Sequence, residues 1–317
     1  MEWIPLIGCV FIAFVIGSND TSNALGICVG CGILRFKKAL LLFGPWVLVG
    51  ILLQGQKVMK TVGQDLLHVN VLVLGVSLFV SALLIIVANW RKLPLSSHQV
   101  IVGSLTGAGA ASGIEVNMDA LAHIALSWVV SPLSAFTSAF LIYKVMEKSL
   151  SQLPVFVVER ILKISLLINA VLISYNTGAN ELATVLGGAV YSGLISPMQA
   201  SFVGSALLFA GAALLSARVI ESVGKGITPL DPFSGFAAQF GAAASVLIFT
   251  SLGMPISTTY CIIGGIVGVG VLKGMGTVRT ALLKKIAVSW VVAPTLAFLI
   301  CFCLTKVVTE GIVFRFG

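Results

Sequence analysis

Two acidic residues occupy the same polar setting within otherwise apolar stretches of the sequence. Asp20 lies in residues 17–26, GSNDTSNALG, and Glu181 lies in residues 178–187, GANELATVLG. A charged residue at the centre of a membrane helix costs roughly 2.5 to 3.5 kcal/mol, so two of them imply compensation by a bound cation, a proton or a substrate. Carboxylate, amide and hydroxyl oxygens, with carbonyls freed where a helix breaks at glycine, suit sodium.

The polar residues of these two segments form the predicted cation site. The residues expected to bind sodium are Asp20, Asn23, Asn180, Glu181 and Thr184, supported by Asn19, Thr21 and Ser22. Both segments are bounded by glycine and rich in side chains that bond to backbone groups, which favours broken helices. Hydrogen bonding between neighbouring membrane helices is the alternative interpretation of these residues.

A second pair of motifs has the features of helix starts that bind an anion. Residues 94–99 read PLSSHQ and residues 255–260 read PISTTY, and a glycine-rich apolar run follows each. Proline followed by hydroxyl residues predicts a helix N-terminus, whose free N–H groups and positive dipole end attract an oxyanion. Two such ends entering from opposite faces would enclose a tetrahedral anion; an ordinary membrane helix start is the alternative. The residues expected to bind the anion are Ser96, Ser97, Ser257, Thr258 and Thr259, with Ser104 and Thr106 supporting.

None of the four motifs contains arginine or lysine. Because a dianion moved into low dielectric needs a positive partner, co-transported cations beside Asp20 and Glu181 are expected to supply it. The carboxylates would also favour hydrogen phosphate, which can donate a hydrogen bond, over sulfate, which cannot. His98 replaces the second threonine of the partner motif and is interpreted as a hydrogen-bonding residue or a proton carrier.

The composition excludes a water-soluble fold. Of the 317 residues, 58% are hydrophobic and 9% are charged, and the mean hydropathy is +1.10. Apolar stretches of membrane-spanning length recur, and no alternating barrel pattern is present, so the expected fold is an all-α integral membrane protein with about 10 to 12 membrane segments. The net charge of +8 sits in short clusters at the ends of apolar runs, which is typical of topology determinants rather than a nucleic-acid surface.

The N-terminus and the cysteines add two smaller expectations. Glu2 near the start and the lack of an early base do not fit a signal peptide, so the first apolar run is expected to stay in the membrane. Cys28 and Cys31 have the spacing of a redox or zinc motif, but there is no second pair and no flanking histidine. Packing is therefore the favoured role of these cysteines, with a metal or redox role as the alternative.

The motifs reveal an internal repeat. Positions 17 and 178 differ by 161, and so do positions 94 and 255, which start the two copies of the second motif. The register holds between the motifs and slips by one residue near the end of each copy. We therefore divide the chain into a first repeat at 1–143, a charged linker at 144–163 and a second repeat at 164–317.

Charges that are present in one copy are missing from the other. Arg35, Lys37 and Lys38 match uncharged residues of the second half, and the basic residues at 273–285 match a stretch without a base in the first half. By the positive-inside rule, matching loops then lie on opposite faces, which is an inverted-topology repeat with broken helices or re-entrant hairpins. We count five crossings per half, a cytoplasmic linker and two extracytoplasmic termini. Such repeats are typical of alternating-access transporters, with a symmetric channel or scaffold as the alternative.

These residues resemble the inorganic phosphate transporter (PiT) family of sodium- or proton-coupled carriers. The duplicated signature of that family is close to GANDVANAxG, which residues 17–26 match closely, whereas residues 178–187 depart at Glu181 and Thr184. The signature P-[IV]-S-T-T-H is preserved in PISTTY and is looser in PLSSHQ. The resemblance covers both halves and implies phosphate as substrate, homodimers, no hydrolytic chemistry and, because the linker is short, a prokaryotic carrier.

The sequence thus predicts a multi-pass transporter of the cell membrane that imports inorganic phosphate with sodium and needs no cofactor besides the coupling ions. A proton-coupled carrier of phosphate or of a metal-phosphate complex is the nearest alternative, and an anion channel is a further one. No motif of a hydrolase, metalloprotease or nucleotide-binding enzyme is present, so an enzyme is not expected.

The predicted topology can be tested by cysteine labelling. Single cysteines are placed at the two termini and in the 144–163 linker. On intact cells they are expected to form two groups that differ in their reaction with a membrane-impermeant maleimide. Both termini should react from outside, and the linker should react only after permeabilisation. Termini that label from opposite faces would contradict the inverted repeat, because each half must then cross an even number of times.

Overall fold

The computed structural model describes residues 3–30, 32–90, 95–226, 231–274 and 280–316. Within these residues the regular secondary structure is entirely helical, as predicted. Seven of the described helical spans are long and apolar enough to cross a membrane. Large apolar side chains point outward from the bundle, among them Leu53, Leu133 and Val291. Such a surface is typical of a protein that faces lipid rather than water.

The helices follow the two repeats in the same order. The first half contains α1 (Trp3–Gly30), α2 (Phe36–Lys60), the π-helical turn η1 (Thr61–Asp65), α3 (Val71–Trp90), α4 (Ser97–Ala111) and α5 (Met118–Leu150). The second half contains α6 (Val155–Asn176), the π-helical segment η2 (Thr177–Leu182), α7 (Ala183–Tyr191), α8 (Pro197–Gly226), α9 (Pro232–Ser251), α10 (Thr258–Lys273) and α11 (Thr280–Phe316). The residues from Lys144 to Lys163 mostly continue α5 and α6, which a short turn joins.

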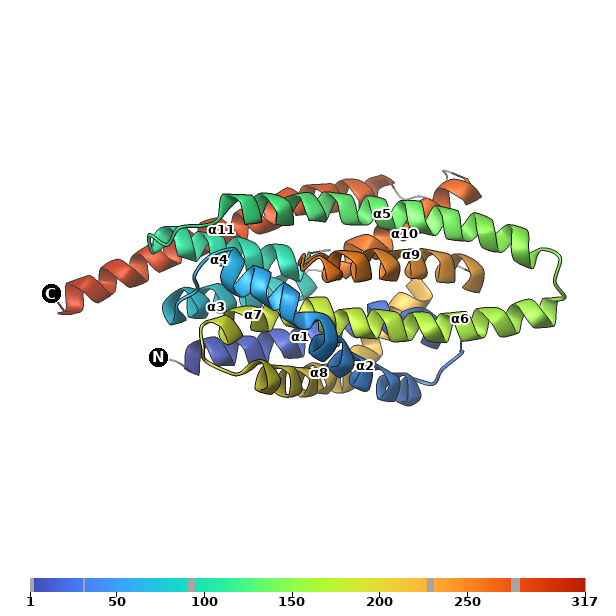
Figure 1. Cartoon of the computed structure of the whole chain (residues 1–317), viewed down its shortest axis with the longest axis horizontal. Coiled ribbons are helices and arrows are strands. Elements are labelled where there is room, and N and C mark those ends of the chain that lie inside the picture. Colours follow the sequence, from blue (N-terminus) through green and yellow to red (C-terminus); the bar gives the residue numbers. More distant parts are fainter. Residues whose placement is uncertain (1–2, 31, 91–94, 227–230, 275–279, 317) are drawn as a thin grey trace.

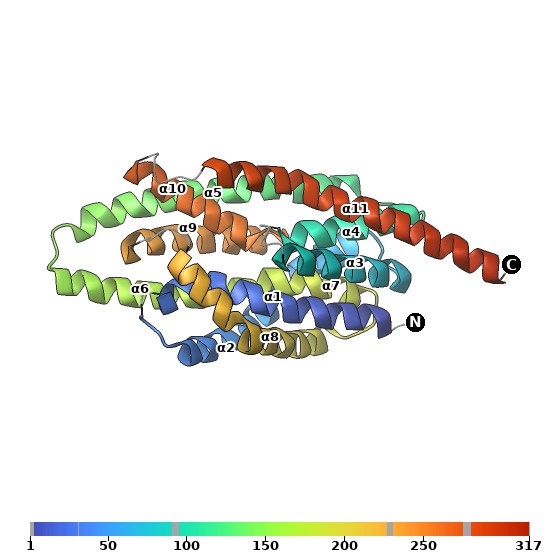
Figure 2. The same ribbon diagram turned by 180° about the vertical axis from the view of Figure 1, so that it is seen from behind.

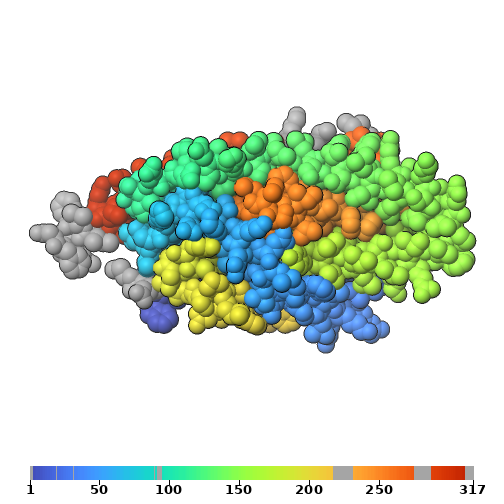
Figure 3. Space-filling model, viewed as in Figure 1, coloured from blue at the N-terminus to red at the C-terminus, as the bar shows by residue number. Residues whose placement is uncertain are grey.

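The helices form an elongated bundle with two distinct ends (Figures 1 and 2). The start of α1 and the end of α11 lie at one end, here called the terminal end. The α5–α6 turn lies at the opposite, linker end, where α9 is visible between α5 and α6 (Figure 3). The α3–α4 hairpin is confined to the terminal half of the bundle, and the α9–α10 hairpin to the linker half.

The count of five crossings per half stays a prediction, since the seven described spans are identified by length and composition only. Both views show the α3–α4 and α9–α10 hairpins turning back near the middle of the bundle (Figures 1 and 2). The count treated the 20-residue α3 and the 15-residue α4 as full crossings, since their apolar composition resembles that of a spanning helix. Arg91 and Lys92, further basic residues of the first half that match the uncharged Leu252 and Gly253, lie outside the described residues.

Glycines allow the long helices to touch backbone to backbone. A Cβ atom on Gly17 would lie 1.9 Å from the carbonyl oxygen of Leu208, and one on Gly178 would lie 1.9 Å from that of Val47. Positions 17 and 178 differ by 161, and so do positions 47 and 208. The contacts of α1 with α8 therefore repeat as contacts of η2 with α2.

Other glycine contacts recur in the same register. Gly50 meets the carbonyl oxygen of Tyr175, and Gly211 meets that of Phe14. The two glycines are again 161 positions apart, and so are the two residues that they meet. In the hairpins, Gly103 of α4 meets Pro294 of α11, and Gly264 of α10 meets Pro132 of α5. Small residues of this kind let membrane helices approach closely. The two hairpins are therefore seated in the same way against equivalent long helices.

The first helix of each hairpin, α3 or α9, begins with a side-chain cap. Asn70 accepts a hydrogen bond from the Val73 N–H at 2.8 Å, and its counterpart Asp231 accepts one from the Ser234 N–H at 3.0 Å. Asp231 also pairs with Lys273 in the last turn of α10, which closes the α9–α10 hairpin. Partial burial of Asp231 opposes its ionisation, but hydrogen bonds from Lys273 and Ser234 outweigh burial and hold the pKa of this carboxyl below its usual value.

Alanine at Gly50 or Gly211 is expected to lower the apparent melting temperature of the detergent-solubilised protein. A Cβ atom at either position would lie 2.0 Å from a backbone oxygen, so the helices must separate, which costs about 1 to 3 kcal/mol for an overpacked core. Gly75→Ala is the matched control, since its Cβ would meet Ile4 at an ordinary 3.4 Å. Equal melting temperatures for all three variants would contradict the close backbone contacts.

Candidate functional site

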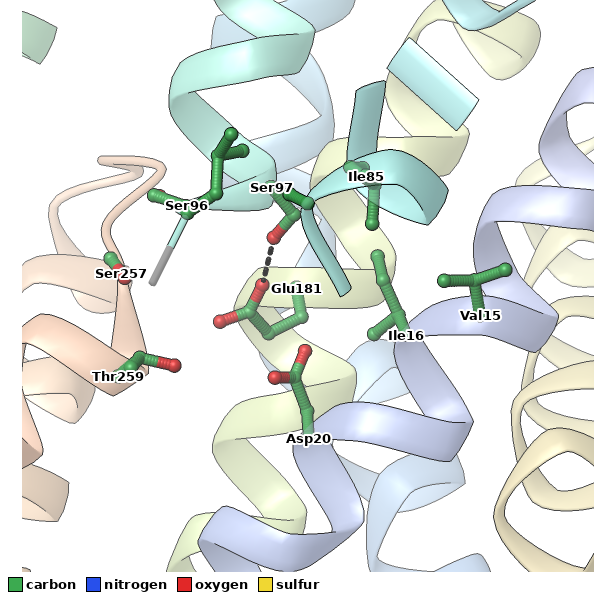
Figure 4. A pocket seen from close by; sticks show the side chains of 11 residues that line it. Val15, Ile16, Asp20, Ile85, Ser96, Ser97, Glu181, Ser257 and Thr259 are labelled. Atoms are coloured by element: carbon green, nitrogen blue, oxygen red, sulfur yellow. Dashed lines mark hydrogen bonds between the residues drawn. The ribbon is translucent and has the colours of Figure 1, made fainter. Parts of the chain in front are cut away.

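The four motifs meet at a small cavity near the middle of the bundle. Its polar lining comes from the two carboxylates and from the first residues of both inner hairpin helices, and its apolar lining comes mainly from α1 and α3 (Figure 4). The predicted site residues that line it are Asp20, Ser96, Ser97, Glu181, Ser257 and Thr259. Residues as far apart in the sequence as Asp20 and Thr259 are thus brought together, as the repeat predicted.

The two carboxylates lie at equivalent positions on different backbones. Asp20 belongs to α1, which runs as an unbroken α-helix through residues 17–26, so the break expected there is absent. Glu181 belongs to the π-helical segment Thr177–Leu182, where the regular α-helix is interrupted. Both side chains are buried, and Figure 4 shows both carboxylates in the cavity. A π-helical turn inside an α-helix is often found at a functional site.

Glu181 contacts both hairpins. Its carboxylate accepts a hydrogen bond from the Ser97 hydroxyl at 3.0 Å and a longer one from the Thr258 backbone N–H at 3.4 Å. The Nδ1 atom of His98 lies 3.2 Å from the same carboxylate, and both side chains are buried. One carboxylate therefore links the first turn of α4 to the first turn of α10.

Asp20 has a different set of contacts. The Asn23 amide donates to the Asp20 carboxylate at 3.2 Å and to the Thr259 hydroxyl at 3.1 Å. The backbone carbonyl of Asn23 accepts a hydrogen bond from Gln239 at 2.9 Å. Asn23 therefore connects the first acidic motif to the α9–α10 hairpin, and it leaves one side of Asp20 facing the cavity.

The starts of α4 and α10 carry buried hydroxyls that lack partners. Ser257 caps α10 by accepting from the Tyr260 N–H at 3.3 Å, whereas Ser96 precedes α4 without a side-chain cap. Within the described residues, the hydroxyls of Ser96 and Thr258 have no hydrogen-bond partner. Buried polar groups are normally satisfied, so these two hydroxyls indicate that a polar ligand completes their bonding. An oxyanion at the helix starts fits this requirement.

Asn180 and Thr184 do not join the predicted cation site. The Asn180 amide donates to the Thr250 hydroxyl at 2.7 Å and to the Met254 carbonyl at 2.9 Å, and its oxygen accepts from the Ile256 N–H at 3.1 Å. The Thr184 hydroxyl donates to the Asn180 carbonyl within its own helix. Neither residue lines the cavity. Asn180 instead holds η2 against the turn between α9 and α10.

The supporting residues of the prediction do not line the cavity. Thr21 and Thr106 bond to carbonyls of their own helices, and the backbone carbonyl of Ser104 accepts a bond from Ser77. Ser22 is buried, and the Asn19 side chain lies outside the described residues, as does Cys31. The Cys28 thiol is buried and points to the Leu166 carbonyl at 3.1 Å, which fits packing.

Sequence reasoning missed several polar residues that support the hairpins. Gln239 accepts a hydrogen bond from Asn169 at 3.2 Å and donates one to the Asn23 carbonyl. Trp128 donates to the Pro255 carbonyl at 2.8 Å, directly before the α10 start. Asn169 and Gln239 each stand alone in an apolar stretch, which is the one signal that would have marked them.

Comparisons with known proteins agree with this architecture. A model of the phosphate transporter family matches residues 16–301. A protein of Methanocaldococcus jannaschii assigned as a phosphate permease is 36% identical over 96% of this chain and 97% of its own length. The sulfate permease CysP of Bacillus subtilis is 27% identical over 96% of this chain and 88% of its own length.

One solved structure shares the fold. A structure described as the sodium-dependent phosphate transporter superposes with a TM-score of 0.84 at 23% identity, covering 98% of this chain and 99% of the other. The fold and the family are those of a multi-pass membrane transporter, not of an enzyme. The chain belongs to the phosphate transporter family, as its motifs predicted.

Asn180→Ala is expected to destabilise the protein. The change removes three hydrogen bonds and leaves the buried Ile256 N–H without its partner, which costs about 1 to 3 kcal/mol. Ser174→Ala is the control, because within the described part of the chain that hydroxyl bonds only to the Ala170 carbonyl of its own helix. Melting temperature and the sodium dependence of phosphate uptake should be measured together. Unchanged melting with lost sodium dependence would instead assign Asn180 as a cation ligand.

Proposed function

We propose that this chain is a secondary active transporter that imports inorganic phosphate together with sodium by alternating access. The observation that carries the proposal is the cavity in which two buried carboxylates face the hydroxyl-rich starts of α4 and α10. Membership of the phosphate transporter family supports phosphate as the substrate. The fold shared with a sodium-dependent phosphate transporter is consistent with sodium as the coupling ion.

Charge balance supports coupling. Phosphate would bring up to two negative charges to a cavity that already contains Asp20 and Glu181, and no lysine or arginine lines it among the described residues. Unpaired buried charges are costly, so the anion is favoured only when cations arrive with it. The Asp20 carboxylate and the Thr259 hydroxyl, which both accept hydrogen bonds from the Asn23 amide, are hard oxygen donors of the kind that sodium prefers.

The arrangement of the helices supports alternating access. Glycine contacts of equivalent helices recur at an offset of 161, and the two hairpins enter the bundle from opposite ends. These features favour an inverted repeat in which the halves exchange conformations around a central site. The basic segments at 35–38 and 144–163 both lie at the linker end, which supports a cytoplasmic linker end and extracytoplasmic termini.

Uptake of radiolabelled phosphate into proteoliposomes tests the proposal. Uptake is expected to saturate and to require an inward sodium gradient, with no stimulation by potassium. A pH gradient that drives uptake without sodium would replace sodium by protons as the coupling ion. Uptake that does not saturate and needs no cation gradient would indicate a channel.

Competition by sulfate in the same assay tests the substrate, since a family relative is named as a sulfate permease. Hydrogen phosphate can donate a hydrogen bond to the Asp20 carboxylate, whereas sulfate has no proton to donate. Excess sulfate is expected to leave wild-type uptake unchanged and to inhibit the residual uptake of Asp20→Asn. Equal rejection of sulfate by both proteins would rule out a role for Asp20 in this choice.

A further inference from the structure

The two equivalent carboxylates of the cavity are not used in the same way. Glu181 is hydrogen bonded to Ser97 on α4 and to the N–H of Thr258 on α10, which are themselves equivalent positions of the two hairpins. Asp20 is hydrogen bonded to Asn23 of its own helix. A carboxylate that bridges two helix starts accepts the same kinds of hydrogen bonds that a phosphate oxygen would accept there.

We propose that the Glu181 carboxylate and the substrate anion compete for the same donors, so that a cation must draw Glu181 away before phosphate can bind. This inference rests on the function proposed above and adds an order of binding to it. Glu181 thus acts as a tethered anion that closes the α4 and α10 starts over the site. Sodium is then required twice, as counter-charge and as the ion that frees the anion site.

The length of the side chain makes this competition possible. Glu181 stands where the other repeat has Asp20, and its additional methylene group extends the carboxylate toward the hairpins. The Ser97 hydroxyl and the Thr258 N–H reach its two different oxygens, so one carboxylate spans the gap between α4 and α10. His98 lies 3.2 Å from the oxygen that Ser97 also reaches.

The unsatisfied hydroxyls show that Glu181 fills the anion site only in part. Ser96 and Thr258 carry buried hydroxyls without partners among the described residues, and both belong to the same two helix starts. A tetrahedral anion has four oxygens, two more than a carboxylate. Replacement of Glu181 by phosphate would therefore satisfy donors that the carboxylate leaves unused, which favours exchange once a cation has stabilised the displaced side chain.

The cavity provides the place to which Glu181 can move. Asp20 lies across it, and the two carboxylates are near enough to interact electrostatically. Two carboxylates without a cation repel each other, so Glu181 is favoured at the helix starts, where N–H and hydroxyl groups stabilise its charge. A cation between the carboxylates removes this repulsion and attracts Glu181 toward Asp20. Sodium and phosphate binding are then positively coupled.

Glu181→Asp separates this competition from simple charge effects, because it keeps the carboxylate and removes the methylene needed to reach both hairpins. Binding of radiolabelled phosphate to the purified full-length protein should be measured over a series of sodium concentrations, with choline as replacement. For the wild type, saturating sodium is expected to strengthen phosphate binding about ten-fold or more, within the usual range of coupling between two ligands. For Glu181→Asp, phosphate binding without sodium should tighten, and the sodium effect should shrink several-fold.

Two further variants make the result decisive. Glu181→Gln, which lacks the negative charge, should also bind phosphate with little dependence on sodium. Asp20→Asn keeps Glu181 at the helix starts and weakens the cation site, so its phosphate binding should stay weak at all sodium concentrations. Melting temperatures establish that each variant is folded.

The outcomes distinguish this inference from the proposed function. Wild-type sodium dependence that persists unchanged in Glu181→Asp and Glu181→Gln overturns the competition and leaves symport intact. Wild-type phosphate binding that is equally strong with and without sodium contradicts symport and the competition together. Tight phosphate binding without sodium in both Glu181 variants, together with weak binding at all sodium concentrations in Asp20→Asn, supports the competition.

Discussion

Negative charge held away from water has to be balanced by groups fixed in the protein or by ions that travel with it, and this constraint organises the centre of the molecule. Asp20 and Glu181 are both buried beside the starts of two short helices. The helix starts provide N–H groups and hydroxyls, which stabilise an anion without introducing a positive residue. A site built in this way holds either its own carboxylate or a substrate anion, but it holds both only with added positive charge.

The long helices hold these helix starts together near the middle of the bundle. A short helix can begin in the middle of the bundle only if its backbone is buried in protein, since lipid offers no hydrogen bonds. Gly103 and Gly264 allow α4 and α10 to lie directly against α11 and α5. Asn180 and Trp128 then bond the turn that precedes α10, at Ile256 and Pro255. Polar groups of that turn are thus satisfied by side chains of the protein rather than by solvent.

The second half departs from the repeat in its polar contacts. Three asparagines of α6 and η2, at positions 169, 176 and 180, each donate a hydrogen bond to α9. The matching positions of the first half include Gly8 and Val15, which cannot make such bonds. The α9–α10 hairpin is therefore fastened to its neighbouring helix by amides, whereas the α3–α4 hairpin lacks the first two of these contacts. Symmetry of the backbone does not make the two hairpins equally fixed.

The limits of prediction from sequence follow from the same contrast. The repeat, the helical fold and the meeting of the four motifs could be predicted, because a constant offset of 161 places Asp20 and Glu181, and likewise the two helix starts, at related positions. The confinement of the α3–α4 hairpin to one half of the bundle could not, because α3 has the apolar composition of a spanning helix and only packing sets its place. The hydrogen-bond partners of Asn180 could not be predicted either. A buried amide bonds to the groups that the packed helices leave unsatisfied, and here these lie 70 or more residues away in the sequence. Side-chain type indicates that a polar residue needs a partner, while the packing of distant backbone decides whether that partner is an ion or a turn.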